Sequence, residues 1–306
     1  MLAIVIPYYK NAFFRECLES LVKQTNKNFN LYICNDASPE DPEQLIEEYK
    51  NRLNLTYHKF QENLGGKSLT KQWDRCLQLA GDEEWIMILG DDDILGEKVV
   101  ASWYQSREEA EENTNVFRFA SVIIDAQSNS VSEKYMHPIF EKPADSFYRR
   151  FTGKTRSSLS EHIFRKSSYT KYGFLNFPLA WHSDDRAWLD FSEGKPIFTI
   201  NRATVFIRNS TLNISGRTDN FEDKIKASIL FYEYLITQKK RLFTNKQLLE
   251  IARSRINLIL QQQNSSVKEY MALAAFHLKH PDMEIYKRSL KKIPSDLKLF
   301  LRRCIK

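Results

Sequence analysis

The sequence predicts an α/β protein in which helices flank a mostly parallel sheet, with a helical region after it. Over about the first ninety residues, short apolar strands alternate with amphipathic helices, an order that predicts a parallel sheet whose loops meet at one edge. From Asp219 onward, apolar residues recur only at helical spacing. We therefore expect a sheet-based domain over residues 1–216 and a helical region over residues 217–306.

Four apolar segments are predicted as the first strands, because each is rich in β-branched or aromatic residues and ends in polar turn residues. They span residues 2–6, 29–34, 55–60 and 85–89. Apolar residues between these segments recur at steps of three and four, which predicts helices that pack on the sheet. These helices cover Phe14–Val22, Leu45–Leu53 and Leu69–Ala80.

The second part of the predicted domain is less regular. A helix is expected from Val99, and residues 116–124 and 197–208 have strand character. Between the two strands, a polar stretch from Asp125 to about Ser160 shows little periodicity. A structureless segment of that length inside a compact domain is usually a lid or a binding segment, and this is what we expect here.

Composition excludes several classes of protein. The formal charge of +6 is modest, and no basic run is interleaved with aromatic residues, so we expect no nucleic-acid partner. Cys17, Cys34, Cys76 and Cys304 lack C-x-x-C spacing, which indicates reduced core residues of a cytoplasmic protein. No window approaches the roughly 18 apolar residues that a membrane span needs.

A cluster of acids follows the fourth predicted strand. The apolar run Trp85–Leu89 ends in Gly90 and then in Asp91, Asp92 and Asp93. Ligands of open α/β sheets bind at the carboxyl ends of strands, and adjacent carboxylates repel one another unless a cation compensates them. The cluster therefore indicates a metal site, with a solvated acidic turn as the alternative.

A second pair of acidic residues lies about ninety residues later in the sequence. Asp184 and Asp185 stand between Trp181 and Trp188, with Trp188 on the helical face of Asp184. The alternative to a functional site is an ordinary helix start with Ser183 or Asp184 as its N-cap.

Four motifs together resemble a known family. They occur in order after the four strands: Ile4–Tyr9, Asn35–Ser38, Asn63–Gly66 and Leu89–Asp93. In this they are similar to the inverting glycosyltransferases of family 2, which have the GT-A fold. The resemblance implies transfer of a sugar from a nucleotide diphosphate sugar, with a UDP-sugar favoured, to a glycan or lipid-linked acceptor. It further implies a donor-binding half over residues 1–98 and an acceptor-binding half over residues 99–216.

The resemblance also implies a divalent cation, Mn²⁺ or Mg²⁺, at the acidic cluster. Asp92 corresponds to the last acid of the family's D-x-D element and is the leading metal ligand. Gly90 stands where the first acid is expected, a departure that Asp91 offsets, and Asp93 assists by hydrogen bonding or through water.

Roles in donor binding follow from the same resemblance. Asp36 is expected to hydrogen bond the nucleobase, and the Pro7–Tyr9 loop is expected to flank the base or the ribose. Arg208 is the expected phosphate contact, with an ordinary surface arginine as the alternative. The predicted donor-binding residues are Pro7, Tyr8, Tyr9, Asp36, Asn63, Gly65, Lys67, Asp91, Asp92 and Arg208.

The Asp184–Asp185 motif resembles the family's acidic motif that supplies the catalytic base. Aligning Trp188 with the family's aromatic position gives Asp184 the role of base and leaves Asp185 as its neighbour, and a slip of one residue exchanges them. The reaction expected is an inverting transfer in bacterial surface polysaccharide synthesis.

Other readings of the sequence remain open. A catalytically inactive nucleotide-sugar-binding protein of the same fold is the principal alternative, although the acids that it would lack are present. A pyrophosphorylase would need a Gly-rich, Arg-containing loop after the first strand, which Pro7–Lys10 is not. The basic amphipathic tail, residues 289–303, suits either peripheral contact with an anionic bilayer or packing on its own domain. The oligomeric state is left open.

Overall fold

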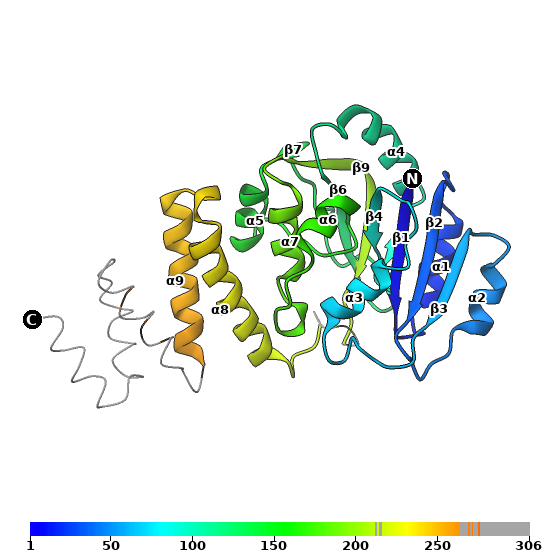
Figure 1. Cartoon of the computed structure of the whole chain (residues 1–306), viewed down its shortest axis with the longest axis horizontal. Coiled ribbons are helices and arrows are strands. Elements are labelled where there is room, and N and C mark those ends of the chain that lie inside the picture. Colours follow the sequence, from blue (N-terminus) through cyan, green and yellow to red (C-terminus); the bar gives the residue numbers. More distant parts are fainter. Residues whose placement is uncertain (212, 214–215, 263–268, 270, 272–274, 276–306) are drawn as a thin grey trace, which may run out of the picture. The chain divides into compact units, whose positions relative to one another are not determined.

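The structure is a computed structural model, and it describes residues 1–211, 213, 216–262, 269, 271 and 275. The chain divides into two compact units, Met1–Asp219 and Asn220–Lys306 (Figure 1). The first unit contains the sheet, and the described part of the second unit is helical.

A mixed sheet, nine-stranded within the described residues, forms the centre of the first unit. Its strand order is β3-β2-β1-β4-β8-β6-β9-β5, and β7 also pairs with β9. The strands are β1 (Leu2–Tyr8), β2 (Phe29–Asn35), β3 (Leu55–Lys59), β4 (Trp85–Ile88), β5 (Ile94–Leu95), β6 (Val116–Ile124), β7 (Phe140–Glu141), β8 (His162–Arg165) and β9 (Ile197–Arg208).

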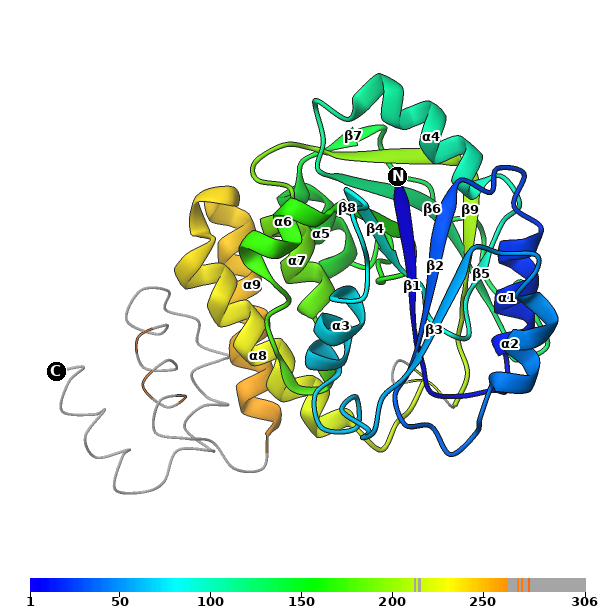
Figure 2. The same cartoon turned by 45° about the vertical axis from the view of Figure 1, so that its right-hand side comes forward.

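The half of the sheet formed by β3, β2, β1 and β4 is parallel, as the sequence predicts. The loops that follow these strands therefore gather at one edge, at the bottom of Figure 2. Beyond β4 the sheet becomes mixed, because β8 runs antiparallel to both β4 and β6, while β6 and β9 are parallel.

Helices of the first unit cover both faces of this sheet (Figure 2). They are α1 (Phe14–Val22), α2 (Glu43–Tyr49), α3 (Leu69–Leu77), α4 (Val99–Ala110), α5 (Pro143–Phe151), α6 (Lys166–Tyr172) and α7 (Ser183–Phe191), with a 3₁₀ turn η1 (Pro178–Ala180).

The alternation along β1 shows how the two faces are built. Leu2, Ile4 and Ile6 pack with α1, α2 and α4, whereas Ala3 and Val5 pack with α3 and α7. All five side chains are fully buried. Burial on both faces explains why the strand is continuously apolar, and each buried Leu or Ile contributes about 1.5–3 kcal/mol.

The expectation of a structureless stretch from Asp125 to Ser160 was wrong. This segment contains β7 and α5. Pro143 occupies the first turn of α5, where its missing N–H costs nothing, and Ala144 and Phe147 form the buried face three residues apart. The helix is only nine residues long, so its periodic signal is short.

The second unit contains α8 (Phe221–Gln238), a 3₁₀ turn η2 (Lys240–Leu242) and α9 (Asn245–Gln261). Ile225 and Ile229 of α8 pack against Ile256 and Ile259 of α9. A capping box between Thr244 and Gln247 begins α9.

Some predictions fall outside the part of the chain that the structure describes. They are the last apolar positions of the expected helical region, at Tyr270, Leu273, Ala274 and Phe276, the basic tail 289–303, and Cys304. The other three cysteines are free and buried. Among the described residues, no helix has the length and apolar character needed to cross a membrane.

Candidate active site

A cleft of about 570 Å³ lies where the loops after β1 to β4 meet the start of α7 and the end of α5. Its volume is within the range of small-molecule sites. Eight of the residues predicted from sequence line it: Pro7, Tyr9, Asp36, Asn63, Gly65, Asp91, Asp92 and Asp184. Tyr8, Lys67, Asp93, Asp185 and Arg208 are not among its lining residues.

Asp36, directly after β2, holds the loop that follows β3. Its carboxylate accepts hydrogen bonds from the backbone N–H groups of Leu64 and Gly65, both at 2.8 Å, and pairs with Arg75. A Cβ atom at position 65 would lie 2.6 Å from Asp36 Oδ2, so this close approach requires glycine. Arg75 in turn lies over the ring of Phe60, at 3.8 Å.

The three residues Pro7, Tyr8 and Tyr9 have different surroundings. Pro7 and Tyr9 line the cleft, but the Tyr8 ring is fully buried and packs on Phe14, with ring centroids 4.6 Å apart. The Tyr8 hydroxyl donates to the carbonyl oxygen of Glu40 at 2.7 Å, and burial raises the pKa of Tyr8. Tyr8 is therefore a core residue that fixes the loop, and Tyr9 faces the site.

The acidic turn after β4 places its three carboxylates differently. Asp91 lines the cleft and accepts the backbone N–H groups of Tyr9 and Lys10, at 2.8 and 2.9 Å. Asp92 also lines the cleft. Asp93 points away from it, is only 7% exposed, and accepts from the Ser160 hydroxyl and from the backbone N–H of Arg208.

Burial and mutual repulsion make this turn unfavourable for negative charge. Burial, followed by the charge of Asp92, raises the pKa of Asp91 to about 7 and that of Asp93 to about 8. Burial also raises the pKa of Asp92. A Cβ atom at Gly90 would lie 2.9 Å from oxygens of both Asp92 and Asp93, so the turn has no room for a further acid there.

The residues fit a divalent cation that is shared with a substrate. No group of three or more potential ligands occurs among the described residues. Mg²⁺ and similar ions, however, are commonly held by one or two carboxylates together with substrate phosphates. Asp91 and Asp92 on the wall of the cleft supply such a pair.

Arg208, the predicted phosphate contact, is an interior residue with a fully buried side chain. Its guanidinium donates to the carbonyl oxygens of Asp92 and Asp125 and pairs with Glu16, at 2.9, 2.7 and 2.9 Å. It also lies over the ring of Phe13, at 4.2 Å. Arg208 thus joins four parts of the chain in the interior.

Lys67, which was also predicted to bind the donor, is exposed and pairs with Glu62.

Four basic residues that were not predicted as site residues line the cleft. They are Lys10, Arg150, Arg156 and Arg217. Lys10 follows the first strand directly, and this position is the signal that could have identified it. Arg150 and Arg156 lie in the stretch that was expected to be structureless. Arg150 is carried by α5, and Arg156 follows this helix and pairs with Glu161.

The two carboxylates of the second acidic motif have different surroundings. Asp184 lines the cleft, whereas Asp185 is 4% exposed and pairs with Arg150 at 2.9 Å and with His182 Nδ1 at 2.7 Å. Burial, followed by the charge of Asp185, raises the pKa of Asp184 to about 7. Burial opposes ionisation of Asp185 too, but Arg150 and His182 lower its pKa overall.

The start of α7 differs from the capped start considered above. His182, with φ of 70°, is at the N-cap position, and Ser183 is the first helical residue. The Ser183 hydroxyl donates to the carbonyl oxygen of Leu175 at 2.6 Å, so it does not cap the helix. Trp188 is buried and stacks on His162, with ring centroids 4.1 Å apart.

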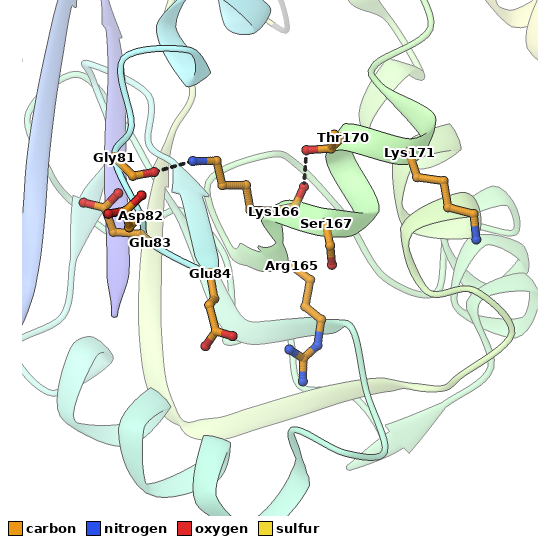
Figure 3. A pocket seen from close by; sticks show the side chains of 9 residues that line it. All are labelled: Gly81, Asp82, Glu83, Glu84, Arg165, Lys166, Ser167, Thr170 and Lys171. Carbon is orange, nitrogen blue, oxygen red and sulfur yellow. Dashed lines mark hydrogen bonds between the residues drawn. The ribbon is translucent and has the colours of Figure 1, made fainter.

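A second pocket, of about 580 Å³, lies at the amino end of β4 (Figure 3). Its three basic side chains are all engaged. Lys166 reaches the carbonyl oxygen of Gly81, as Figure 3 shows, and Lys171 pairs with Glu193 at 2.8 Å. Arg165 lies over the ring of Trp85, at 4.4 Å. We therefore place the candidate active site at the cleft rather than at this pocket.

Solved structures with a similar fold include TarS of S. aureus. The 1–349 fragment of TarS has a TM-score of 0.63 and 18% identity, and the match covers 98% of this chain and 86% of that chain. The same fragment in complex with UDP-GlcNAc has a TM-score of 0.57 and 16% identity, and covers 91% and 73%. At such identities the likeness establishes the fold.

Sequence comparison gives the family. Glycosyltransferase GlyG of Streptococcus pneumoniae serotype 4 is 26% identical over 110 residues. That match spans 36% of this chain and 36% of GlyG, so only about a third of the relative's length is covered. The profile of the family described as Glycosyl transferase family 2 matches residues 3–171. With more than half of its length matched in this way, the chain belongs to glycosyltransferase family 2 and has the GT-A fold.

Proposed function

We propose that the protein catalyses inverting transfer of a sugar from a nucleotide diphosphate sugar to a hydroxyl of a glycan or lipid-linked acceptor. The observation that carries this proposal is the pairing of two acidic sites in one cleft. Asp91 and Asp92 line the cleft together with Asp184, whose pKa is raised to about 7. A general base is most effective when its pKa lies near the working pH.

The donor belongs to the half of the domain formed by residues 1–98. Pro7 and Tyr9 flank the base or the ribose, and Asp36 holds the loop of Asn63 and Gly65 in position for the nucleotide. A UDP-sugar is the favoured donor. TarS supports this choice, since its crystal structures include complexes with UDP and with UDP-GlcNAc.

The diphosphate lies beside Asp91 and Asp92, which would hold Mn²⁺ or Mg²⁺, with Asp92 as the principal ligand. The cation, when bound, neutralises the negative charge of the leaving diphosphate. Lys10 and Arg217 line the same cleft and supply further positive charge, in the role first expected of Arg208. Asp93 stays behind the site and holds the turn through Ser160 and the backbone of Arg208.

The acceptor belongs to the half formed by residues 99–216. Asp184 accepts the proton of the acceptor hydroxyl while that oxygen bonds to the anomeric carbon. The bond from this carbon to the diphosphate oxygen breaks on the opposite face, so the anomeric configuration inverts. Asp185 does not take the proton, because Arg150 and His182 occupy its carboxylate.

The biological setting is part of the proposal. GlyG and TarS both come from bacteria. We place the reaction in bacterial surface polysaccharide synthesis, at the cytoplasmic face of the membrane, with the basic tail 289–303 as the contact to the lipid surface.

Calorimetric titration tests the proposal. UDP-, GDP- and dTDP-sugars are titrated into the full chain with and without Mn²⁺. Binding of at least one nucleotide sugar, strengthened by Mn²⁺, is the expected result. If none binds in the presence of the metal, the proposed function is rejected.

A further inference from the structure

An aromatic side chain beside the candidate base has no role in the reaction described so far. Trp181 is half-buried, lines the cleft, and precedes Asp184 by three residues. Leu159, Leu179 and Ala180 line the cleft as well and extend the apolar surface around it. The cleft therefore has an apolar surface beside the charged and polar side chains that line it.

The backbone around Trp181 is held in an unusual conformation. Leu179, Ala180 and His182 have φ angles of 57°, 52° and 70°. Side chains with a Cβ atom rarely adopt this left-handed region, because Cβ approaches the following carbonyl oxygen. Such residues persist only where the surroundings fix them, and they concentrate at functional sites.

Several contacts fix this segment on both sides of Trp181. The backbone N–H of Trp181 donates to the carbonyl oxygen of Pro178 at 3.0 Å. After it, His182 Nδ1 contacts Asp185 at 2.7 Å, and Asp185 pairs with Arg150 of α5 at 2.9 Å. The indole and the carboxylate of Asp184 are therefore presented to the cleft from one restrained segment.

The chemistry of a sugar ring suits this arrangement. One face of a pyranose is formed by C–H groups and stacks on an aromatic face, while the hydroxyls at the ring edge need polar partners. Arg150 and Arg156 line the same cleft and carry N–H groups at its polar margin. An open-chain polyol phosphate or a bare lipid phosphate presents no such apolar face.

We propose that Trp181 is the stacking platform for the acceptor, and that the acceptor therefore ends in a pyranose ring whose reacting hydroxyl is directed at Asp184. This inference rests on the proposed transfer reaction. Trp73 also lines the cleft, but it is only 8% exposed and packs on Phe174, with centroids 5.2 Å apart. It therefore serves as the matched control for Trp181.

Binding is tested by fluorine NMR on the full chain labelled with 5-fluorotryptophan. The chain has five tryptophans, and the Trp181 resonance is assigned by its loss in Trp181→Phe. Methyl β-D-glucopyranoside, methyl β-D-galactopyranoside and methyl N-acetyl-β-D-glucosaminide are titrated with UDP and Mg²⁺ present, and sorbitol is the open-chain control. We expect a saturable shift of the Trp181 resonance with at least one pyranoside and none with sorbitol. No shift with any pyranoside, or an equal shift with sorbitol, overturns the inference.

Kinetics supply the second test, with octyl glycosides of the same three sugars as acceptors and UDP-GlcNAc and UDP-glucose as donors. In Trp181→Ala the KM for the acceptor should rise roughly tenfold, while Trp181→Phe and Trp73→Phe should stay near the wild type. The affinity for UDP with Mn²⁺ should be unchanged in all three variants. Weaker UDP binding in Trp181→Ala would assign the indole to the nucleobase and overturn the inference.

Two further outcomes separate this inference from the proposed function. If the wild type binds UDP with Mn²⁺ but uses none of the octyl glycosides, the pyranose acceptor is rejected and the donor site stands. If the wild type binds no nucleotide, the proposed function itself fails.

Discussion

At the scale of single residues, the aspartates of the cleft show how neighbours decide what one side chain can do. Asp184 and Asp185 are adjacent in sequence, yet the pKa of the half-buried Asp184 is raised and that of the buried Asp185 is lowered. The difference arises because Arg150 and His182 contact Asp185. When the surroundings of two carboxyl groups separate their pKa values in this way, one group can act as a base while the other stays ionised in a structural ion pair.

The first prediction concerns the base. Asp184→Asn should reduce transfer by roughly 10²–10⁴-fold, because it removes the proton acceptor while preserving shape. The affinity for UDP with Mn²⁺, measured by calorimetry, should stay within about twofold, since Asp184 is not among the residues proposed to bind the nucleotide or the metal. Retained turnover would assign the base to Asp185 or to another residue.

The second prediction concerns pH. Because Asp184 must be ionised to accept a proton, kcat at saturating donor and metal should rise with pH through about 7. The charge of Asp185 raises the pKa of Asp184, and Arg150 lowers it. Asp185→Asn should therefore move the rising limb of the profile to lower pH. An unchanged limb, or one that moves to higher pH, would show that these charges do not control the base.

At the scale of elements, one buried arginine joins the end of β9 to three other segments. Arg208 contacts the turn after β4, the loop after β6 and, through Glu16, helix α1. These segments are far apart in sequence, and the turn after β4 lines the cleft through Asp91 and Asp92. The arginine thus sets the position of the acidic turn from behind.

The third prediction follows from that arrangement. Arg208→Ala leaves buried carbonyl oxygens without donors and should lower the free energy of unfolding by about 3 kcal/mol or more. Arg217→Ala is the matched control, because the Arg217 side chain is 50% exposed and lines the cleft. It should change stability by less than about 0.5 kcal/mol while weakening UDP binding.

Urea unfolding with a far-UV signal, together with calorimetry of UDP binding, distinguishes the two arginines. A stable Arg208→Ala variant that has lost only nucleotide affinity would return Arg208 to the role of phosphate contact. Arg208→Lys keeps the charge but not the planar group, so it should remain destabilised.

The sequence predicts an element well when the residues that determine it are close together in the chain. The strands β1 to β4 and the polar loops after them follow from local patterns, and they place Asp36, Asp91 and Asp92 correctly at one edge. Tyr8 was not separated from Tyr9, because the strand was predicted to end at residue 6. In the structure β1 continues to Tyr8, which shares the buried face of Leu2, Ile4 and Ile6.

Other features depend on contacts between distant residues and had no local signal. The buried position of Arg208 depends on Glu16 and Asp125, and the choice between Asp184 and Asp185 depends on Arg150. Helix α5, which carries Arg150, has only two buried apolar residues at helical spacing, Ala144 and Phe147. The association of Arg150 with Asp184 and Asp185 at the cleft therefore could not be predicted from the sequence.

At the scale of the whole first unit, folding brings several carboxyl groups into surroundings where burial and neighbouring negative charges oppose their ionisation. Asp91, Asp93 and Asp184 have folded pKa values of about 7, 8 and 7, well above the value of about 3.9 expected in the unfolded chain. A raised pKa means that the folded state binds protons more tightly. These carboxyl groups therefore contribute most to the free energy of unfolding at low pH, where they are protonated. The contribution is lost as the pH rises through their folded-state pKa values.

The fourth prediction uses the pH window in which this effect can be isolated. Buried histidines act in the opposite direction below about pH 6.5, since their folded pKa values are lowered: His137, His162 and His182. Between pH 7 and about 8.5 only the carboxylates still titrate among these groups. The Tm of the ligand-free protein, measured by calorimetry, should fall across this window. Asp93→Asn should make the fall shallower, because it removes the highest of the three pKa values.

Ligand binding should reverse that loss. A divalent cation competes with protons for Asp91 and Asp92, so Mg²⁺ with UDP should raise the Tm more at pH 8.5 than at pH 7. In Asp92→Asn the same ligands should give a small increase that depends little on pH. If the Tm of the ligand-free protein instead rises between pH 7 and 8.5, the carboxylates are ionised without cost, and the physical reason for placing a cation at the acidic turn is lost.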